Sequence, residues 1–326
     1  MSRTTVLALA SALASIAPSA FRAQPITLAP VKDFDLQRCV PDQPEPITHA
    51  FAVTAQGLYF LVSPPYLTSG SIQYIVKTDF NGTCTGNIAL PEVVSRLWFA
   101  VNSDLSFSVL KQRNGQNVER LELDGTGQII SRVHLEKAVD DMTSAGNQWI
   151  GVSNTGSVDA YNREGAVVKT FLPAWQERVN QKLILAPLSD TLVMLIRGRT
   201  GQADLFDLAA GTDNQVSVAL DDFAAALSTY TNPKQGSIVF SATSDKSGYA
   251  FLSLGGINKA ADGGFIVKVD QTGNVVQHYR CVLPTRRVYA DGWNREGFMF
   301  PSLIRTFGNQ LYVADKRGTV GKYILP

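Results

Sequence analysis

The chain repeats itself, and this feature restricts its fold more than any other. Residues 146–161 (GNQWIGVSNTGSVDAY) align without gaps with residues 308–323 (GNQLYVADKRGTVGKY), about 160 positions further on. Residues 57–82 align with residues 248–273, and both stretches end in Ile-Val-Lys-x-Asp-x-x-Gly. Because two such matches rarely arise by chance, the chain is built from a repeated unit of about 40 residues or more.

Two short signals mark the repeats. The first is a tight turn of Asp or Asn, two residues and a Gly, in which Asp or Asn bonds to nearby backbone and Gly supplies a positive φ. These turns begin at Asp79, Asp124, Asn162 and Asp270, with a version one residue longer at Asp207. The second signal is a polar corner before an apolar strand, with six copies beginning at Gln56, Ser103, Gly146, Ser189, Lys246 and Gly308. The chain therefore has six repeats.

The second repeat indicates what one unit contains. It divides into four strands, predicted at residues 96–101, 105–111, 118–124 and 128–135. Alternation punctuated by Gly and Pro is typical of strands and argues against a helical solenoid. Units of about 40 to 60 residues with four strands each predict an all-β fold, a six-bladed β-propeller of four-stranded antiparallel blades.

The two ends of the chain predict how the ring closes. The sixth repeat ends at Pro326, after the third of its expected strands. Residues 26–40 precede the first repeat, and the segment Arg38-Cys39-Val40-Pro41 resembles Arg280-Cys281-Val282-Leu283-Pro284 after the outer strand of the fifth repeat. We therefore expect the N-terminal segment to supply the missing outer strand of the last blade, which removes exposed edges from the ring.

Residues 1–23 have the pattern of a secretory signal peptide, with cleavage expected near residues 20–23. Their apolar run, residues 6–18, is shorter than the roughly 20 residues that span a membrane, and no other long apolar run follows. Residues 24–326 are predicted to form a single exported domain, periplasmic or secreted. Loss of Arg3 and Arg22 takes the formal charge from +1 to −1, which disfavours nucleic acid as a partner.

Residues 308–315 (GNQLYVAD), with Val320 after a short loop, resemble the second strand of an NHL repeat. The architecture of nearly the whole of residues 24–326 is similar to that of six-bladed propellers of the NHL-repeat and gluconolactonase-like kind. This resemblance implies the fold. It also implies two different activities, since such propellers include binding scaffolds and metal-dependent lactonases.

Common catalytic motifs are absent from the sequence. It contains no G-x-S-x-G nucleophile elbow, P-loop, G-x-G-x-x-G turn or H-E-x-x-H helix. The three histidines are scattered, and a structural role is predicted for each: His49, His134 and His278.

Three cysteines, Cys39, Cys84 and Cys281, allow at most one disulfide within the chain. Cys39 and Cys281 hold corresponding positions after the outer strands of neighbouring blades, so one possible pairing ties the closing strand to blade five. Against it, outer strands of adjacent blades diverge, and a disulfide needs Cα atoms within about 7 Å. The pairing stays open at this point. No catalytic thiol is expected, because no histidine accompanies any of the three.

Long loops are expected on one face of the propeller, where binding residues tend to gather. Guanidinium groups beside aromatic rings suit carboxylate, phosphate or sugar-acid ligands. The alternative for each residue is an ordinary solvated loop. The candidate ligand-binding residues are Trp175, Arg197, Arg199, Arg286, Arg287, Tyr289, Trp293 and Arg295.

Acidic residues are expected where the inner strands begin, around the central channel. Lactonase-like propellers are implied to hold a metal there, with a Glu in a Glu-Gly-Pro setting that this sequence lacks. Turn formation by Asp is the alternative role. The candidate ligands for a divalent cation such as Ca²⁺ are Asp140, Asp141, Asp221, Asp222 and Asp291.

Together these features predict an exported, non-catalytic module that binds a ligand or a protein through its long-loop face. The expected partner is a small acidic ligand or an envelope protein, and no cofactor is predicted. The alternative is a metal-dependent lactonase or esterase-type hydrolase that uses the channel carboxylates. A purely structural module in a larger envelope assembly is the third possibility.

Overall fold

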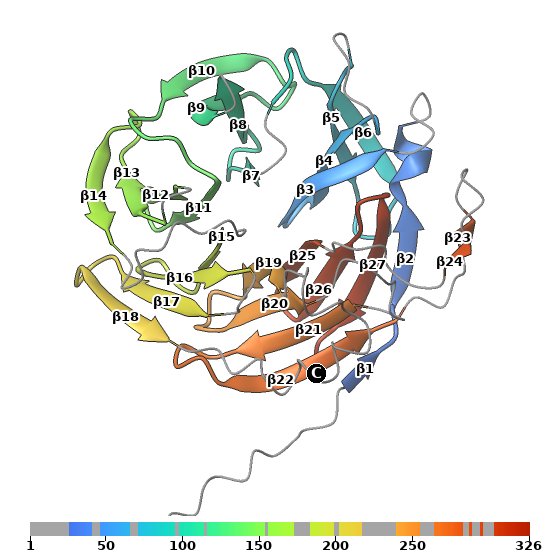
Figure 1. The fold of residues 1–326 in the computed structure, drawn as a ribbon. Coiled ribbons are helices and arrows are strands. Elements are labelled where there is room, and N and C mark those ends of the chain that lie inside the picture. The colour runs from blue at the N-terminus through green and yellow to red at the C-terminus, as the bar shows by residue number, and fades with distance from the viewer. Residues whose placement is uncertain are drawn as a thin grey trace, which may run out of the picture.

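The computed structural model is a ring of six β-sheets around a central axis (Figure 1). It describes residues 26–40, 46–65, 71–94, 98–113, 116–153, 156–172, 183–198, 202–216, 239–254, 264–282, 287–288, 294–295 and 303–326. Each sheet contains an antiparallel run of four strands and forms one blade. The predicted six-bladed β-propeller is therefore confirmed.

The blades follow one another in chain order, with the inner strand of each given first. Blades 1 to 3 are β3 (Ile47–Thr54), β4 (Gly57–Ser63), β5 (Tyr74–Thr78) and β6 (Cys84–Ala89); β7 (Phe99–Val101), β8 (Phe107–Arg113), β9 (Gln116–Leu123) and β10 (Ile129–His134); and β11 (Asp141–Ala145), β12 (Gln148–Val152), β13 (Val158–Tyr161) and β14 (Val167–Phe171). Blades 4 to 6 are β15 (Leu183–Pro187), β16 (Leu192–Arg197), β17 (Ala203–Asp207) and β18 (Thr212–Val216); β19 (Val239–Ser244), β20 (Ala250–Leu254), β21 (Gly264–Val269) and β22 (Val275–Cys281); and β25 (Leu303–Phe307), β26 (Gln310–Ala314), β27 (Thr319–Ile324) and β2 (Lys32–Asp35). The second blade thus has the four strands that the sequence predicts.

The hydrophobic core is divided among the gaps between blades. Each of the six buried clusters joins two neighbouring blades, and together they run round the ring. Between blades 1 and 2, for example, the ring centres of Tyr59 and Phe107 lie 5.9 Å apart. Strand β4 is buried along its whole length, because it lies inside its own sheet and between two neighbouring blades. This explains why the second strand of a repeat has the longest apolar run.

The predicted Asp turns close the outer hairpins. In the first blade, Asp79 accepts hydrogen bonds from the backbone N–H groups of Asn81 and Thr83, both at 2.8 Å. Gly82 then has φ +82°, and a Cβ at this position would overlap the ring of Phe34 in β2. The turn therefore needs glycine both for its backbone conformation and for its contact with the N-terminal strand.

The N-terminal segment closes the ring as predicted, and it does so across two blades. Strand β2 pairs antiparallel with β27, with Phe34 opposite Val320, and becomes the outer strand of blade 6. Before it, β1 (Ile26–Leu28) pairs parallel with β22, with Leu28 opposite Cys281, and adds a fifth strand to blade 5. The sequence signals did not indicate this fifth strand. The segment, drawn in blue, therefore links blades 5 and 6 (Figure 1).

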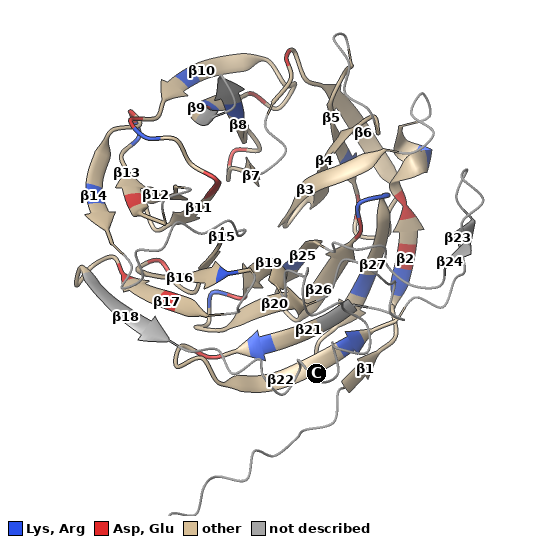
Figure 2. Cartoon of the chain, in the orientation of Figure 1, with Lys and Arg blue, Asp and Glu red and all other residues tan. Residues whose placement is uncertain are grey.

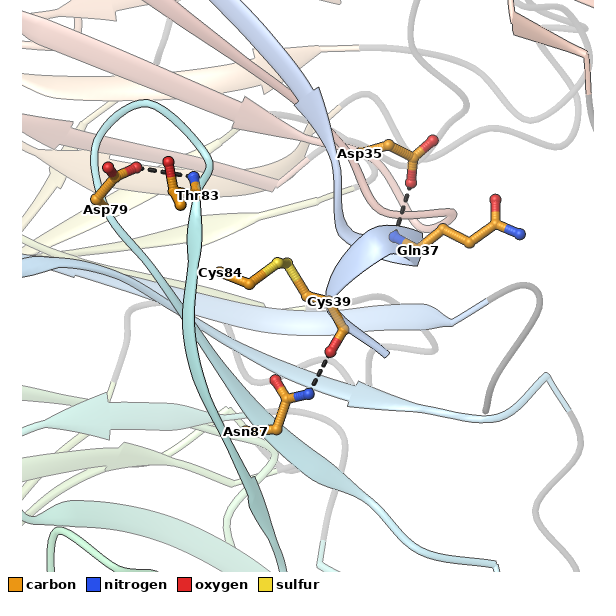
Figure 3. Close-up of a disulfide and its surroundings, with 7 residues drawn as sticks. All are labelled: Asp35, Gln37, Cys39, Asp79, Thr83, Cys84 and Asn87. Atoms are coloured by element: carbon orange, nitrogen blue, oxygen red, sulfur yellow. Dashed lines mark hydrogen bonds between the residues drawn. A yellow bond between two sulfur atoms is a disulfide. The ribbon is translucent and has the colours of Figure 1, made fainter. Parts of the chain in front are cut away.

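The disulfide joins Cys39 to Cys84, so the possible pairing of Cys39 with Cys281 is wrong (Figure 3). Strand β1 already covers Cys281, and the chain then continues past blade 6 into η1 (Leu36–Cys39), which places Cys39 one blade further round the ring. There it faces β6 of blade 1, with a Cα–Cα separation of 5.5 Å that suits a disulfide. Asn87 adds a hydrogen bond to the Cys39 carbonyl. Cys281 stays a buried thiol whose pKa is raised by burial.

Residues 1–23, the predicted signal peptide, lie outside the described ranges, so export and the domain limits stay predictions. Within those ranges, no helix is both long and apolar enough to cross a membrane.

Candidate functional site

The six inner strands surround a central cavity of about 540 Å³. Residues of β3, β7, β11, β15, β19 and β25 all line it, and each of these strands lies at the edge of its own sheet. Small-ligand sites usually occupy about 300–1,000 Å³, so the cavity has a suitable size. It is therefore the candidate site that the fold itself provides.

The inner strands all run in the same direction, which gives the cavity two distinct ends. Each strand begins at the face where the links between blades arrive, and ends at a short turn into the second strand. We call the first of these the long-loop face and the second the turn face. Asp140 directly precedes β11 and so lies toward the long-loop face, whereas Lys246 follows β19 and lies toward the turn face.

Blade 3 supplies the acidic wall of the cavity. Asp140 is exposed to the cavity, and within the described part of the chain no hydrogen bond or ion pair reaches its carboxylate. Its backbone N–H is held by the carbonyl of Val152 at 2.7 Å, which fixes the residue at the start of β11. Surrounding protein displaces water from the carboxylate and raises the pKa of Asp140 above its ordinary value.

The neighbouring Asp141 has a different environment. One carboxylate oxygen accepts from the N–H of Met142 at 2.9 Å, and the other from the N–H of Leu185 in blade 4 at 3.0 Å. The side chain therefore joins the inner strands of blades 3 and 4 while its negative charge stays at the cavity. Asp141 is a structural residue that also contributes to the electrostatics of the site.

Blades 5, 6 and 1 supply the basic wall. Arg305 in β25 donates to the carbonyl of Ile304 at 2.7 Å, and its guanidinium lies 5.4 Å from the ring centre of Phe51. Burial lowers the pKa of Arg305, and the negative charge of Asp141 partly opposes this change. An arginine nevertheless stays protonated at neutral pH. Lys246 carries a second positive charge, and His49 Nε2 lies 2.7 Å from the Ser63 hydroxyl.

Blades 2 and 4 form apolar side walls between the charged ones. Trp98 lines the cavity from blade 2 and packs edge-to-face on Trp149, with ring centres 5.3 Å apart. The guanidinium of Arg120 lies over the ring of Trp149, 4.6 Å from its centre, and so stabilises the pair. Leu183 and Ile184 line the cavity from blade 4. The indole of Trp98 is therefore a rigid apolar surface beside the charged groups.

The charged walls face each other, because blades 3 and 6 are opposite in a ring of six. Acidic colour at β11 and basic colour on β25 lie on opposite sides of the channel (Figure 2). Two carboxylates, Asp140 and Asp141, and two permanent cations, Arg305 and Lys246, are among the described lining residues. Their formal charges cancel, so the described part of the lining is polarised across the width of the cavity without a net charge.

Of the predicted acidic residues, the structure places Asp140 and Asp141 at the channel, as expected from their position before an inner strand. No group of three or more His, Cys, Asp or Glu side chains within the described ranges is arranged to hold a metal ion. The remaining predicted ligands lie outside those ranges: Asp221, Asp222 and Asp291.

Of the predicted ligand-binding residues, Arg197 ends β16 and donates to the Gln202 side chain at 2.8 Å, away from the cavity lining. Arg287 and Arg295 are opposite each other in a short hairpin of β23 (Arg287–Val288) and β24 (Asn294–Arg295). The others lie outside the described ranges: Trp175, Arg199, Arg286, Tyr289 and Trp293.

Three ionisable side chains of the described lining were not among the predicted site residues. His49, predicted to be structural, lines the channel, and so do Arg305 and Lys246. One signal was available for Arg305. It lies three residues before the glycine that opens the turn, where the gap-free match between repeats places Thr143 of blade 3. A charged residue at an inner-strand position that is neutral in another repeat marks a channel residue.

The sequence matches no protein-family model and no curated protein. Solved structures are similar over most of the chain. Virginiamycin B lyase from Staphylococcus aureus aligns over 90% of this chain and 99% of its own, with a TM-score of 0.53 and 11% identity. A streptogramin B lyase aligns over 90% and 97%, with a TM-score of 0.54 and 11% identity. The WD40 repeats of RRP9 align over 93% and 100%, with a TM-score of 0.55 and 13% identity. The likeness is one of fold alone.

Proposed function

We propose that this chain is an exported binding protein that holds a small polar ligand in its central channel without transforming it. The observation that carries the proposal is the carboxylate of Asp140, which has no partner among the described residues and faces the guanidinium of Arg305 across the cavity. The ligand enters at the long-loop face, toward which Asp140 lies.

The energetics of Asp140 support a binding role. Confining a carboxylate without a partner costs stability, and the raised pKa of Asp140 expresses this cost. The carboxylates of the outer turns at Asp79, Asp124 and Asp270, by contrast, accept backbone N–H groups. A group kept in an unfavourable environment inside a cavity is a candidate for function, because a ligand of opposite charge would remove the cost.

The test is a thermal-shift screen of small charged metabolites against the purified mature chain. Asp140→Asn and Arg305→Met are compared with matched substitutions on the outside of the ring, Asp270→Asn and Arg132→Met. We expect compounds that stabilise the wild type and both outer variants, and that lose at least about half of their shift in the channel variants. Equal shifts in all five proteins would place binding outside the channel and contradict the proposal.

A metal-dependent hydrolase is the second candidate, favoured by the two successive carboxylates of Asp140 and Asp141 at the channel. Two propellers of similar fold are lyases by name, so the fold is compatible with catalysis. If the chain is a hydrolase, Ca²⁺ or Mn²⁺ will bind stoichiometrically to the wild type and not to Asp140→Asn, and lactones or esters will be cleaved only with the cation. Absence of stoichiometric metal in the purified protein and in titrations would exclude it.

A further inference from the structure

We infer that the ligand is a short zwitterionic peptide of two or three residues with free termini, its ammonium group at Asp140 and its carboxylate at Arg305. This inference rests on the proposed function and specifies the ligand class of the same cavity. Three features of the described residues support it: the balance of charge, the depth of each charged group and the backbone edges that line the channel.

The balance of charge excludes a simple anion or cation as the best ligand. The lining has two carboxylates on blade 3 and two cations, Arg305 and Lys246, on blades 6 and 5. An anion beside Arg305 would leave Asp140 without a partner among the described residues, and a cation beside Asp140 would leave the guanidinium of Arg305 with only the Ile304 carbonyl, the Phe51 ring and the more distant charge of Asp141. Because an uncompensated charge in a confined site is costly, a ligand that carries both charges matches the cavity best.

The depth of the charged groups gives the separation of the two charges. Counted back from the last residue of each inner strand, Arg305 is two residues from the end of β25, whereas Asp141 is four residues from the end of β11 and Asp140 one further. At about 3.3 Å per residue, the Cα atoms of Asp141 and Asp140 lie roughly 7–10 Å nearer the long-loop face than the Cα atom of Arg305. An extended peptide of two or three residues spans a similar length.

The backbone edges favour a peptide over another zwitterion. All six inner strands are edge strands that pair with one neighbour in their sheet, so their outer N–H and C=O groups point toward the channel. Some of these groups bind neighbouring blades, as Leu185 N–H does with Asp141. Strand edges pair readily with extended peptide backbone. The apolar walls, with Trp98 on one side, accept small side chains.

The experiment is calorimetric titration with three peptides of one sequence: trialanine, N-acetyl-trialanine and trialanine amide. We expect trialanine to bind wild-type protein at least about tenfold more tightly than either capped form. Asp140→Asn should bind trialanine and N-acetyl-trialanine equally, because it cannot distinguish a free amine. Arg305→Met should bind trialanine and its amide equally. The outer variants Asp270→Asn and Arg132→Met should keep the wild-type preference.

Two outcomes would overturn the inference. Capped peptides that bind the wild type as tightly as trialanine show that the termini are not recognised, and no binding of any of the three shows that the ligand is not a short peptide. In both cases the proposed function is judged separately, by the screen of small charged compounds on the same variants. If Arg305→Met fails to fold, Arg305→Lys takes its place, and because it keeps the charge but loses the planar fork it should narrow the wild-type preference for trialanine over trialanine amide. An unchanged preference in that variant would contradict the assignment of the carboxylate to Arg305.

Discussion

The aspartates of the outer turns and Asp140 of the central channel have the same side chain in opposite environments. Hydrogen bonds from Thr126 and Gln128 lower the pKa of Asp124. At Asp270 burial acts to raise the pKa, but bonds from Thr272 and Asn274 outweigh it, and the pKa is lowered. At Asp140 burial acts alone, and the pKa is raised. The outer carboxylates thus stabilise the fold in their charged form, whereas ionisation of Asp140 in the channel lowers the stability of the fold.

This difference separates structural from functional carboxylates in a repeat protein. The outer turns use the acceptor capacity of Asp to fix hairpins, as Asp79 and Asp124 do. In the channel, Asp141 accepts from its own strand with one oxygen and from the neighbouring strand β15 with the other, while Asp140 beside it keeps its acceptors for a group from outside. Stability therefore resides at the periphery of the ring and binding capacity at its axis. The predictions below test this division, from the largest effect to the smallest.

The largest effect is expected from the peripheral disulfide. Cys39 and Cys84 close a loop of 45 residues, and the chain-entropy model gives about 4 kcal/mol of stability for a loop of this length. The double substitution Cys39→Ser, Cys84→Ser should lower the melting temperature by roughly 8 °C or more. Calorimetry measures this loss. Peptide binding at the axis should stay unchanged when measured well below the new melting temperature.

The matched control is reduction. Dithiothreitol should lower the melting temperature of the wild type to that of the double variant and should leave the variant itself unaffected. A wild type that melts at the same temperature with and without reductant would show that the disulfide between η1 and β6 contributes no stability. The main argument for a stabilising periphery would then be lost.

A smaller loss is expected from a single outer turn. Asp270 accepts the backbone N–H groups of Thr272 and Asn274, each at 2.9 Å. Asp270→Ala leaves both without their partner and should cost about 1–2 kcal/mol, whereas Asp270→Asn should cost far less, because Asn162 closes the same turn in blade 3. Chemical denaturation of the wild type, Asp270→Ala and Asp270→Asn measures the order of their stabilities. Equal losses for Ala and Asn would show that shape alone fixes the turn.

The same turn predicts a dependence on pH. Because the folded pKa of Asp270 lies below its unfolded value, its charged form stabilises the fold above about pH 4. That contribution disappears as the pH falls from the unfolded value through the lower folded one. Stability should therefore fall less steeply below pH 4 in Asp270→Asn than in the wild type, as measured by denaturation at a series of pH values.

Much of the fold could be predicted from the sequence because the signals that specify it are local. The Asp turns, the polar corners and the missing outer strand of the sixth repeat each lie within a few residues. Strand β1 escaped prediction because three residues, Ile26–Leu28, carry no periodicity of their own. The disulfide partner of Cys39 could not be predicted for a different reason, since the pairing depends on which gap between blades the closing segment reaches.

The site could be predicted on one wall only. Asp140 directly precedes an inner strand and Asp141 begins it, so their place at the channel follows from the repeat. Arg305 faces them only because half a ring lies between blades 3 and 6, and such opposition is a property of closure, not of any sequence window. The residue type of Arg305 adds little to the prediction of the site, since a single Arg in a strand is usually a solvated residue. Opposed walls are therefore the part of a propeller site that sequence patterns miss.

The smallest predicted effect is a gain in stability at the axis, opposite in sign to those at the periphery. Because the folded pKa of Asp140 lies above its unfolded value, ionisation of this group disfavours the fold. Asp140→Asn removes the charge and should raise the melting temperature at pH 7 by about 1–2 °C, a small size that suits a partly exposed group. The gain should shrink as the pH falls through the raised folded pKa, and should vanish only well below about pH 4, where the carboxyl is protonated in both folded and unfolded chains.

The variant that gains this stability should be the one that loses discrimination for the free amine of trialanine. A gain in melting temperature together with unchanged peptide preference would mean that Asp140 is merely unfavourable, and the division between a stable periphery and a binding axis would fail at its central residue. A loss of stability at pH 7 would show that the carboxylate has a stabilising partner, which removes the reason to assign it a ligand.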